Sequence, residues 1–274
     1  MRSTQPLTYS SYLKVGDLLA LQRRLTDAHD ELQFIVVHQT FELWFKLLLF
    51  ELESIRAALD RGDIPDAIHV LRRTHEILKT LTSAWAVIET MRPIDFLTFR
   101  SELKPASGFQ SLQFREIEYL SGLKDARYLN AFAGDEPSQT VLRRRLVEPS
   151  LWDAFVGLLR ARGLPAANDE SMLQTLVRIQ KRGDLADLDD LTEAMIEYDL
   201  LFSAWRERHV LMTERMIGGR PGTGEETVMK IIGGSEAGKS PPSGEYFSGV
   251  HYLKTTLTKR FFPLLWEART FVER

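Results

Sequence analysis

Residues 31–61 read ELQFIVVHQTFELWFKLLLFELESIRAALDR and form the longest uninterrupted helical pattern in the chain. Asp30 stands where a helix N-cap is expected, and Gly62 and Pro65 end the pattern. Apolar residues fall on overlapping helix faces, with Leu43, Leu47 and Phe50 at four- and three-residue spacing, Ile35 before them and Ile55 after them. Such a helix is roughly 45 Å long. Because its middle is apolar almost all round, we expect a central helix surrounded by others.

His38 lies between Phe34 and Phe41 in this stretch, where little water can solvate an imidazole. One interpretation is a core histidine that is hydrogen-bonded to a neighbour, and the other is a histidine of a functional site. Glu42 is four residues further on and shares a helix face with His38. The segment has no HExxH pattern, so spacing alone does not favour a zinc site.

The composition predicts one large domain, residues 1–274, that is soluble and cytoplasmic. A net charge of −3 gives no sign of binding to nucleic acid or to an anionic membrane. The chain has no cysteine, which excludes disulfides, cysteine-ligated metals and a cysteine nucleophile. It also lacks an apolar leader and any 18-residue apolar window, so we expect no membrane span.

The rest of the chain is also helical in pattern, and the fold class predicted is all-α, a bundle of long antiparallel helices. From the residues alone, Arg100 is either a surface guanidinium or a clamp for a substrate carboxylate. His209 is likewise either a partly exposed histidine or a ligand. Helical patterns are expected over Ser11 to Leu25, Pro65 to Met91, two patches between Pro93 and Gly122, Pro137 to Asp184 with breaks, Asp187 to Ile217, and Val250 to Leu257.

Glycine and proline dominate from Gly218 to Gly249, which predicts a long loop of the kind that forms lids, with a short strand at Thr227 to Ile232. Gly233, Gly238, Lys239 and Ser240 match the phosphate-loop pattern GxxxxGK[ST]. That motif requires a helix to continue from the lysine, whereas Pro241 and Pro242 follow at once. A nucleotide site is therefore not favoured.

Six blocks of sequence together resemble the tryptophan 2,3-dioxygenase family, in the same order and over nearly the whole chain. The blocks are LTYSSYL (7–13), FIVVHQTFELWFK (34–46), DFLTFR (95–100), PASGFQSLQFREIE (105–118), WRERHV (205–210) and GTG (222–224). The resemblance implies an enzyme with one haem b per subunit that inserts both atoms of O₂ into L-tryptophan and forms N-formyl-L-kynurenine, in tryptophan catabolism. One alternative is a mono-oxygenating relative that forms a 2-oxindole from a tryptophan derivative, and another is a non-catalytic helical scaffold.

The resemblance implies roles for four residues around the haem. His209 would be the proximal ligand of the iron, for which a neutral imidazole is suited. Trp85 would lie near the haem edge. His38 would be the distal histidine that hydrogen-bonds the indole N–H, and Ser107 would contact it.

The substrate residues follow from the same resemblance. Arg100 would bind the carboxylate of the amino acid, Thr223 would lie near its ammonium group, and Phe34 and Phe96 would form the wall of the indole pocket. An N-terminal segment would reach into the site of a neighbouring subunit, which implies a homotetramer built as a dimer of dimers. The residues of that segment are Tyr9, Tyr12 and Leu13.

One stretch departs from the family pattern, because roughly twenty extra residues, Glu225 to Phe247, separate GTG from the last helical pattern. We expect the loop from Gly218 to Gly249 to be mobile without substrate, and its inserted section to affect turnover more than folding.

Overall fold

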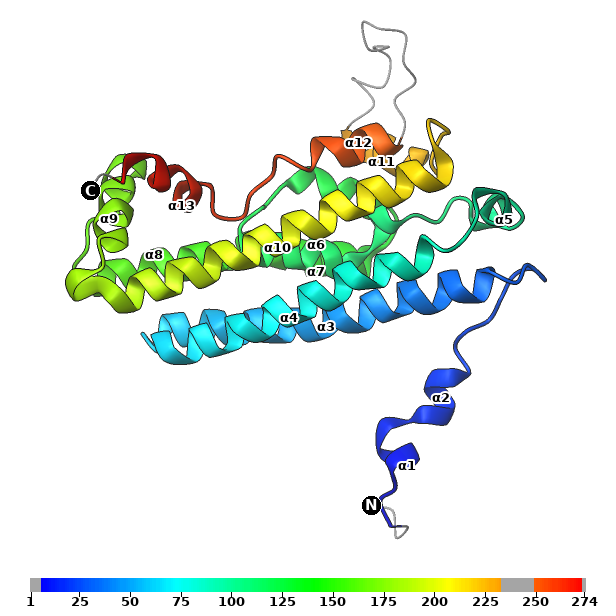
Figure 1. The fold of residues 1–274 in the computed structure, drawn as a ribbon, viewed down its shortest axis with the longest axis horizontal. Helices are drawn as coiled ribbons and strands as arrows, with labels where there is room; N and C mark the ends of the chain where they lie inside the picture. Colours follow the sequence, from blue (N-terminus) through cyan, green and yellow to red (C-terminus); the bar gives the residue numbers. More distant parts are fainter. Residues whose placement is uncertain (1–5, 233–248, 273–274) are drawn as a thin grey trace, which may run out of the picture.

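Three long helices, α3 (Glu31–Asp60), α4 (Ile64–Ile88) and α10 (Ala186–Ile217), form the body of the protein and lie lengthwise in Figure 1. The computed structural model describes residues 6–232 and 249–272. Within these ranges every regular element is an α-helix or a 3-10 helix, which confirms the all-α fold class.

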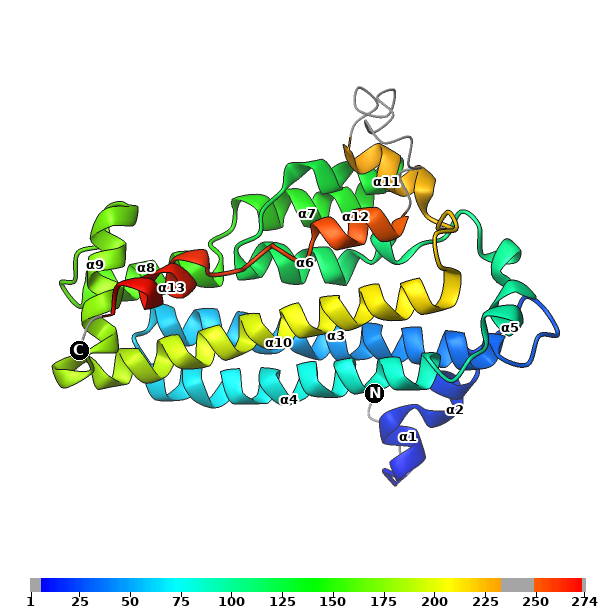
Figure 2. The ribbon, with the colours of Figure 1, turned by 45° about the horizontal axis from the view of Figure 1, so that its top comes forward.

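The long helices are not all antiparallel. α3 and α4 are joined by a tight turn in which Gly62 has a positive φ of 73°, so these two run in opposite directions. His75 on α4 contacts the carbonyl of Ala194 on α10, and further along Trp85 packs against Trp205. The residue numbers of the contacting pairs increase along both helices, so α4 and α10 run in the same direction (Figure 2). Helices α5 to α9 make the return between them.

One face of α3 is buried and another is open. Leu48 is fully buried, whereas Leu43 is 54% exposed and Phe50 is 64% exposed. The expectation that other helices surround α3 is therefore wrong for this single chain. Asp30 occupies the N-cap position but makes no side-chain cap hydrogen bond, and its carboxylate instead accepts from His29 Nδ1 at 2.6 Å.

Shorter helices cover the long ones. α6 (Leu112–Ser121) and α8 (Leu151–Ala161) pack on α3, and α9 (Asp169–Gln180) contacts α10. The helical pattern expected up to Leu25 ends at Leu19, and the one expected up to Met91 ends at Ile88. The other elements are α1 (Tyr9–Leu13), α2 (Val15–Leu19), α5 (Pro93–Leu97), α7 (Glu136–Val147), α12 (Gly249–Thr255), α13 (Pro263–Ala268), η1 (Arg100–Leu103), η2 (Gly108–Gln110), η3 (Ala126–Phe132), η4 (Gly183–Leu185) and η5 (Arg269–Phe271).

The segment after GTG is a helix, α11 (Glu225–Ile232), so the strand expected at Thr227 to Ile232 is wrong. Val228 and Ile231 lie three residues apart on one face of α11 and are buried in a second, smaller core with Tyr119, Tyr128 and Tyr252. Residues 233–248 of the expected loop, which include those that match the phosphate-loop pattern, lie outside the described residues. The helical start of the inserted section therefore belongs to a packed core.

The main core extends along α3, α4 and α10 and continues to Phe262 and Leu265 near the C-terminal end. Among the residues described, no helix combines the length and the apolar character needed to cross a membrane.

Candidate active site

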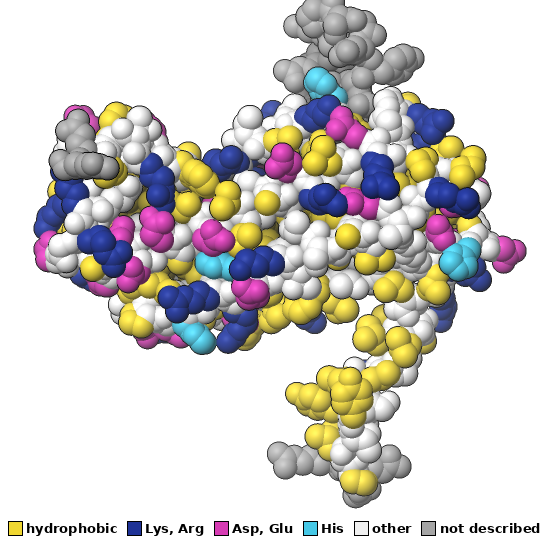
Figure 3. Space-filling view, viewed as in Figure 1, with side chains coloured by type: hydrophobic (Ala, Val, Ile, Leu, Met, Phe, Trp, Pro, Cys, Tyr) yellow, Lys and Arg dark blue, Asp and Glu magenta, His cyan; other side chains and the backbone are white. Residues whose placement is uncertain are grey.

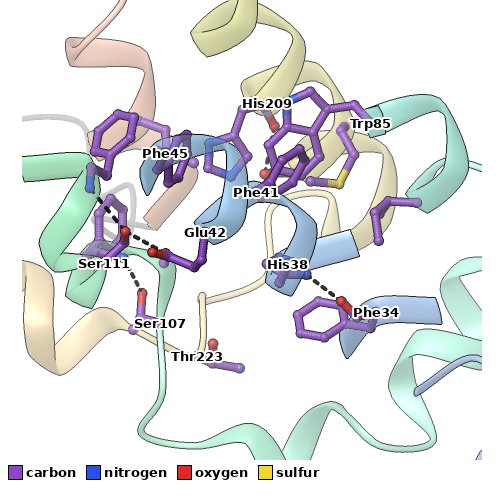
Figure 4. Close-up of a pocket in the computed structure, with 18 of the residues that line it drawn as sticks. Phe34, His38, Phe41, Glu42, Phe45, Trp85, Ser107, Ser111, His209 and Thr223 are labelled. Atoms are coloured by element: carbon purple, nitrogen blue, oxygen red, sulfur yellow. Dashed lines mark hydrogen bonds between the residues drawn. The ribbon is translucent and has the colours of Figure 1, made fainter. Parts of the chain in front are cut away.

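A cavity of about 630 Å³ lies among α3, α4, α10 and the loops that follow α5 and α10. Figure 4 shows His209 and Trp85 in its upper part, and His38, Phe34, Ser107 and Thr223 in its lower part. Most of its lining is apolar, so only a few polar side chains are available to bind a charged group of a ligand. Residues from all the long helices line it, including Phe34, His38, Phe41, Glu42, Phe45, Trp85, Ile88, Met91, Phe96, Arg100, Ser107, Ser111, Gln113, Trp205, His209, Met212, Met216 and Thr223.

His38 has a defined tautomer in this cavity. Its Nδ1 lies 2.7 Å from the carbonyl oxygen of Phe34, one helical turn earlier. Because a carbonyl only accepts, Nδ1 carries the hydrogen, and the Nε2 of the neutral ring is an acceptor. Burial lowers the pKa of His38, although the backbone hydrogen bond and the charge of Glu42 act in the opposite direction. The imidazole is therefore neutral at pH 7 and can accept a hydrogen bond from a ligand N–H.

His209 lies on α10 and lines the same cavity. Burial lowers its pKa to about 4, and the nearby His38 adds to this effect. Its ring is stacked on the indole of Trp85. Within the described part of the chain, neither histidine belongs to a group of three or more His, Cys, Asp or Glu side chains that could hold a metal ion. A metal at His209 would therefore need ligands from outside the protein.

The loop that carries Thr223 is packed against the loop that carries Ser107. Thr223 Oγ1 donates to the carbonyl of Ala106 at 2.9 Å, and the guanidinium of Arg100 donates to the carbonyl of Pro221. A Cβ at Gly224 would overlap the side chain of Ser107, so this close approach requires glycine. Arg100 and Thr223 therefore border the same part of the cavity.

Arg100 begins η1 at the cavity wall. Burial and the neighbouring Arg220 lower its pKa, but an arginine remains charged at any ordinary pH. The charge of Glu225 acts on Arg100 in the opposite direction. The cavity thus contains the guanidinium of Arg100, which donates to a backbone carbonyl. Such a group suits the carboxylate of a ligand.

The cavity brings together eight of the residues expected from the sequence: Phe34, His38, Trp85, Phe96, Arg100, Ser107, His209 and Thr223. The three residues Tyr9, Tyr12 and Leu13 do not line it. They lie on α1, which projects away from the body in Figure 1, and Tyr9 and Tyr12 are 78% and 70% exposed. Ser107 is the N-cap of η2, where its hydroxyl accepts from the N–H of Phe109 at 3.3 Å.

Two polar groups of the wall were not assigned from the sequence. One is Glu42 with Ser111 and Gln113, whose only signal was the four-residue spacing from His38. The other is a buried ionic group in which Glu118 accepts from Arg115 at 2.6 Å and from Arg206 at 2.8 Å. The pair of Glu118 with Arg206 joins α6 to α10 across the cavity wall, whereas the pair with Arg115 lies within α6. Arg206 is 88 residues from Glu118, so no local pattern could have indicated the link between the two helices.

Comparison with known proteins finds similarity to one family over nearly the whole chain. The family model "Tryptophan 2,3-dioxygenase" matches residues 1–172. A tryptophan 2,3-dioxygenase of Nocardioides sp. is 43% identical over 272 residues, which cover 96% of this chain and 94% of the relative. Relatives of the same name from Herpetosiphon aurantiacus and Caulobacter vibrioides are 41% and 37% identical, and each match covers 97% of this chain and 98% of the relative. The chain belongs to the tryptophan 2,3-dioxygenase family.

Proposed function

We propose that this protein is a haem-dependent enzyme that cleaves the indole ring of L-tryptophan with O₂ to give N-formyl-L-kynurenine. The observation that carries the proposal is the pair of neutral imidazoles, His38 and His209, in one largely apolar cavity that Arg100 also lines. The names of the relatives support the same substrate and the same reaction class.

The residues of the cavity fit a haem. The indole Nε1–H groups of Trp85 and Trp205 are buried in the wall without a hydrogen-bond partner, and such unpaired donors are rare in proteins. Both flank His209, whose neutral imidazole is of the kind that serves as an axial ligand. One haem b per subunit, held by His209, would supply the centre at which O₂ binds and is activated.

The chain's own groups would bind and orient the substrate. Arg100 would hold the carboxylate by charge-assisted hydrogen bonds, with Thr223 near the ammonium group. Phe34 and Phe96, whose ring centroids are 5.8 Å apart, would pack against the indole. His38 Nε2 would accept the indole N–H, which fixes the orientation of the ring before reaction.

The mass of the product tests this function. Protein supplied with haem and a reductant is incubated with L-tryptophan under ¹⁸O₂, and the expected product is N-formylkynurenine that carries two ¹⁸O atoms. A product with one ¹⁸O atom and a continuing need for reductant would indicate the mono-oxygenating alternative. A wild-type protein that shows no Soret band when haem is supplied would indicate a non-catalytic scaffold.

We also propose a homotetramer in which the N-terminal arm, residues 6–25, lies against a neighbouring subunit. Figure 3 shows the concentration of hydrophobic side chains on this arm. An exposed apolar surface of this kind is typical of an interaction site. Static light scattering of the wild type should give four subunits, and alanine at Tyr9 and Tyr12 should weaken the assembly. The exposed apolar residues of the arm are Leu7, Tyr9, Tyr12, Leu13, Leu18, Leu19, Leu21 and Leu25.

A further inference from the structure

Glu42 lies on α3 one turn after His38, and its side chain lines the cavity. Both oxygens of its carboxylate are used. Oε1 accepts from Ser111 Oγ at 2.7 Å, as drawn in Figure 4, and Oε2 accepts from Gln113 Nε2 at 2.8 Å. Gln113 Nε2 also lies 2.9 Å from the backbone oxygen of Glu42. One side chain therefore connects the helix of His38 to the start of α6.

Both hydrogen-bond partners of the Glu42 carboxylate are donors. Ser111 is the N-cap of α6, and its oxygen already accepts from the N–H of Phe114 at 3.2 Å, so the hydroxyl hydrogen points to Glu42. The amide nitrogen of Gln113 is a donor as well. A group that faces two donors must be an acceptor at both atoms, which a carboxylate is and an amide is not.

The loop that Glu42 holds is the loop that carries Ser107. Ser107 and Ser111 are the N-caps of the consecutive helices η2 and α6, and only the three residues of η2 separate them. Gly224 packs on Ser107, and Thr223 donates to Ala106. A shift of Ser111 would therefore be transmitted through η2 to the wall that faces His38.

We propose that Glu42 is a positioning residue that sets the place of His38 relative to the Ser107 and Thr223 wall through its hydrogen bonds to Ser111 and Gln113. This inference rests on the proposed function, because Glu42 would determine how well the indole N–H of the substrate meets His38 Nε2. Glu42 itself has no role in binding the carboxylate, since its partners are neutral donors.

The test compares two ligands, L-tryptophan and tryptophan methylated on the indole nitrogen, which has no N–H to donate. The wild type should bind L-tryptophan more tightly. In Glu42→Gln we expect this ratio of Kd values to fall by about tenfold, the equivalent of one hydrogen bond. The value of kcat for L-tryptophan should fall as well. Tryptamine lacks the carboxylate that Arg100 would bind, so the ratio of the Kd values of tryptamine and L-tryptophan measures the contribution of Arg100. That ratio should not change in Glu42→Gln.

Two further variants separate positioning from a purely structural role. Ser111→Ala keeps the charge of Glu42 and removes one of its donors, so it should reduce the same ratio even if Glu42→Gln fails to fold. Glu53→Gln removes another hydrogen-bonded carboxylate of α3, one that pairs with Arg145 and does not line the cavity. It is the matched control and should leave the ratio unchanged.

The outcomes are distinct. A wild type that binds neither ligand would overturn the proposed function and this inference with it. A wild type that discriminates between the ligands, with Glu42→Gln and Ser111→Ala unchanged in that ratio and altered only in melting temperature, would overturn the inference alone.

Discussion

The imidazole of His209 and the indole of Trp85 lie parallel, with 3° between the ring planes and 4.7 Å between the ring centroids. The stack belongs to an aromatic wall that also includes Trp205 and Phe41. With an indole against one face, the imidazole is poorly solvated, which disfavours its charged form. This explains why the pKa of His209 is lowered to about 4. The neutral ring keeps a nitrogen lone pair that can bind a metal ion.

His209→Ala should abolish stable haem binding, because it removes the neutral imidazole that would hold the iron at the wall formed by Trp85. We expect purified variant supplied with haem to lose the Soret band of the wild type and to retain its helical circular dichroism. His69→Ala is the control, since His69 is exposed on α4. A wild-type spectrum and haem content in His209→Ala would contradict the assignment.

The pH dependence of kcat/KM should report His38. Burial lowers its pKa below the ordinary histidine value of 6.5, so the ring stays neutral as the pH falls through 6.5. Below the lowered pKa the ring gains a proton on Nε2, and it can no longer accept the indole N–H. We expect kcat/KM to be level near pH 6.5 and to fall only at lower pH. His38→Ala should lose about 100-fold in kcat/KM and also lose this acid limb. If the fall of kcat/KM at low pH persists unchanged in His38→Ala, a group other than His38 causes it.

Arg100→Lys should raise KM for L-tryptophan by about 10- to 150-fold, which corresponds to the ~1.5–3 kcal/mol of a hydrogen bond to a charged group. Lysine cannot reproduce the two parallel N–H donors of a guanidinium. With tryptamine, which lacks the carboxylate, wild type and variant should have similar KM values. Arg92→Lys is the control, because Arg92 pairs with Asp95 and does not line the cavity. An unchanged KM for L-tryptophan would rule out the clamp.

Local patterns predicted the long helices well, but they could not predict what distant residues decide. The spacing within residues 31–61 was enough to place α3, whereas the exposure of Phe50 depends on which neighbours are present. Thr227 to Ile232 is rich in β-branched residues, and a short apolar run of this kind does not distinguish strand from helix. The burial of Val228 and Ile231 against Tyr252 favours the helix. Likewise, the donors to Glu42 lie about 70 residues away, beyond any spacing rule.

Gly224→Ala should disturb the site through a single contact. The new Cβ would overlap the side chain of Ser107, so the Ser107 loop or the Thr223 loop must move. We expect the affinity for L-tryptophan to fall by at least tenfold, with little change in haem content. Gly219→Ala is the control, since a Cβ there would meet nothing within 4 Å. The double variant Gly224→Ala with Ser107→Gly removes the clashing atoms and should recover part of the affinity. If the losses of affinity in the two single variants simply add in the double variant, the contact between Ser107 and the new Cβ is not the cause.

Ile231→Ala tests whether the start of the inserted section is structural. Ile231 is 2% exposed and packs in the second core, so its truncation leaves a cavity that should cost about 2–5 kcal/mol of unfolding free energy. α11 also contacts η2, which lies between the lining residues Ser107 and Ser111, because Gln110 Nε2 donates to Thr227 Oγ1 at 3.3 Å. A loosened α11 should therefore weaken substrate binding as well, whereas haem content should stay close to that of the wild type.

Lys230→Ala is the control, since Lys230 is exposed and its ion pair with Glu226 is worth at most about 1 kcal/mol. Urea unfolding of both variants measures the difference. Equal stability in the two would mean that α11 does not anchor the second core, and that this section acts on turnover alone.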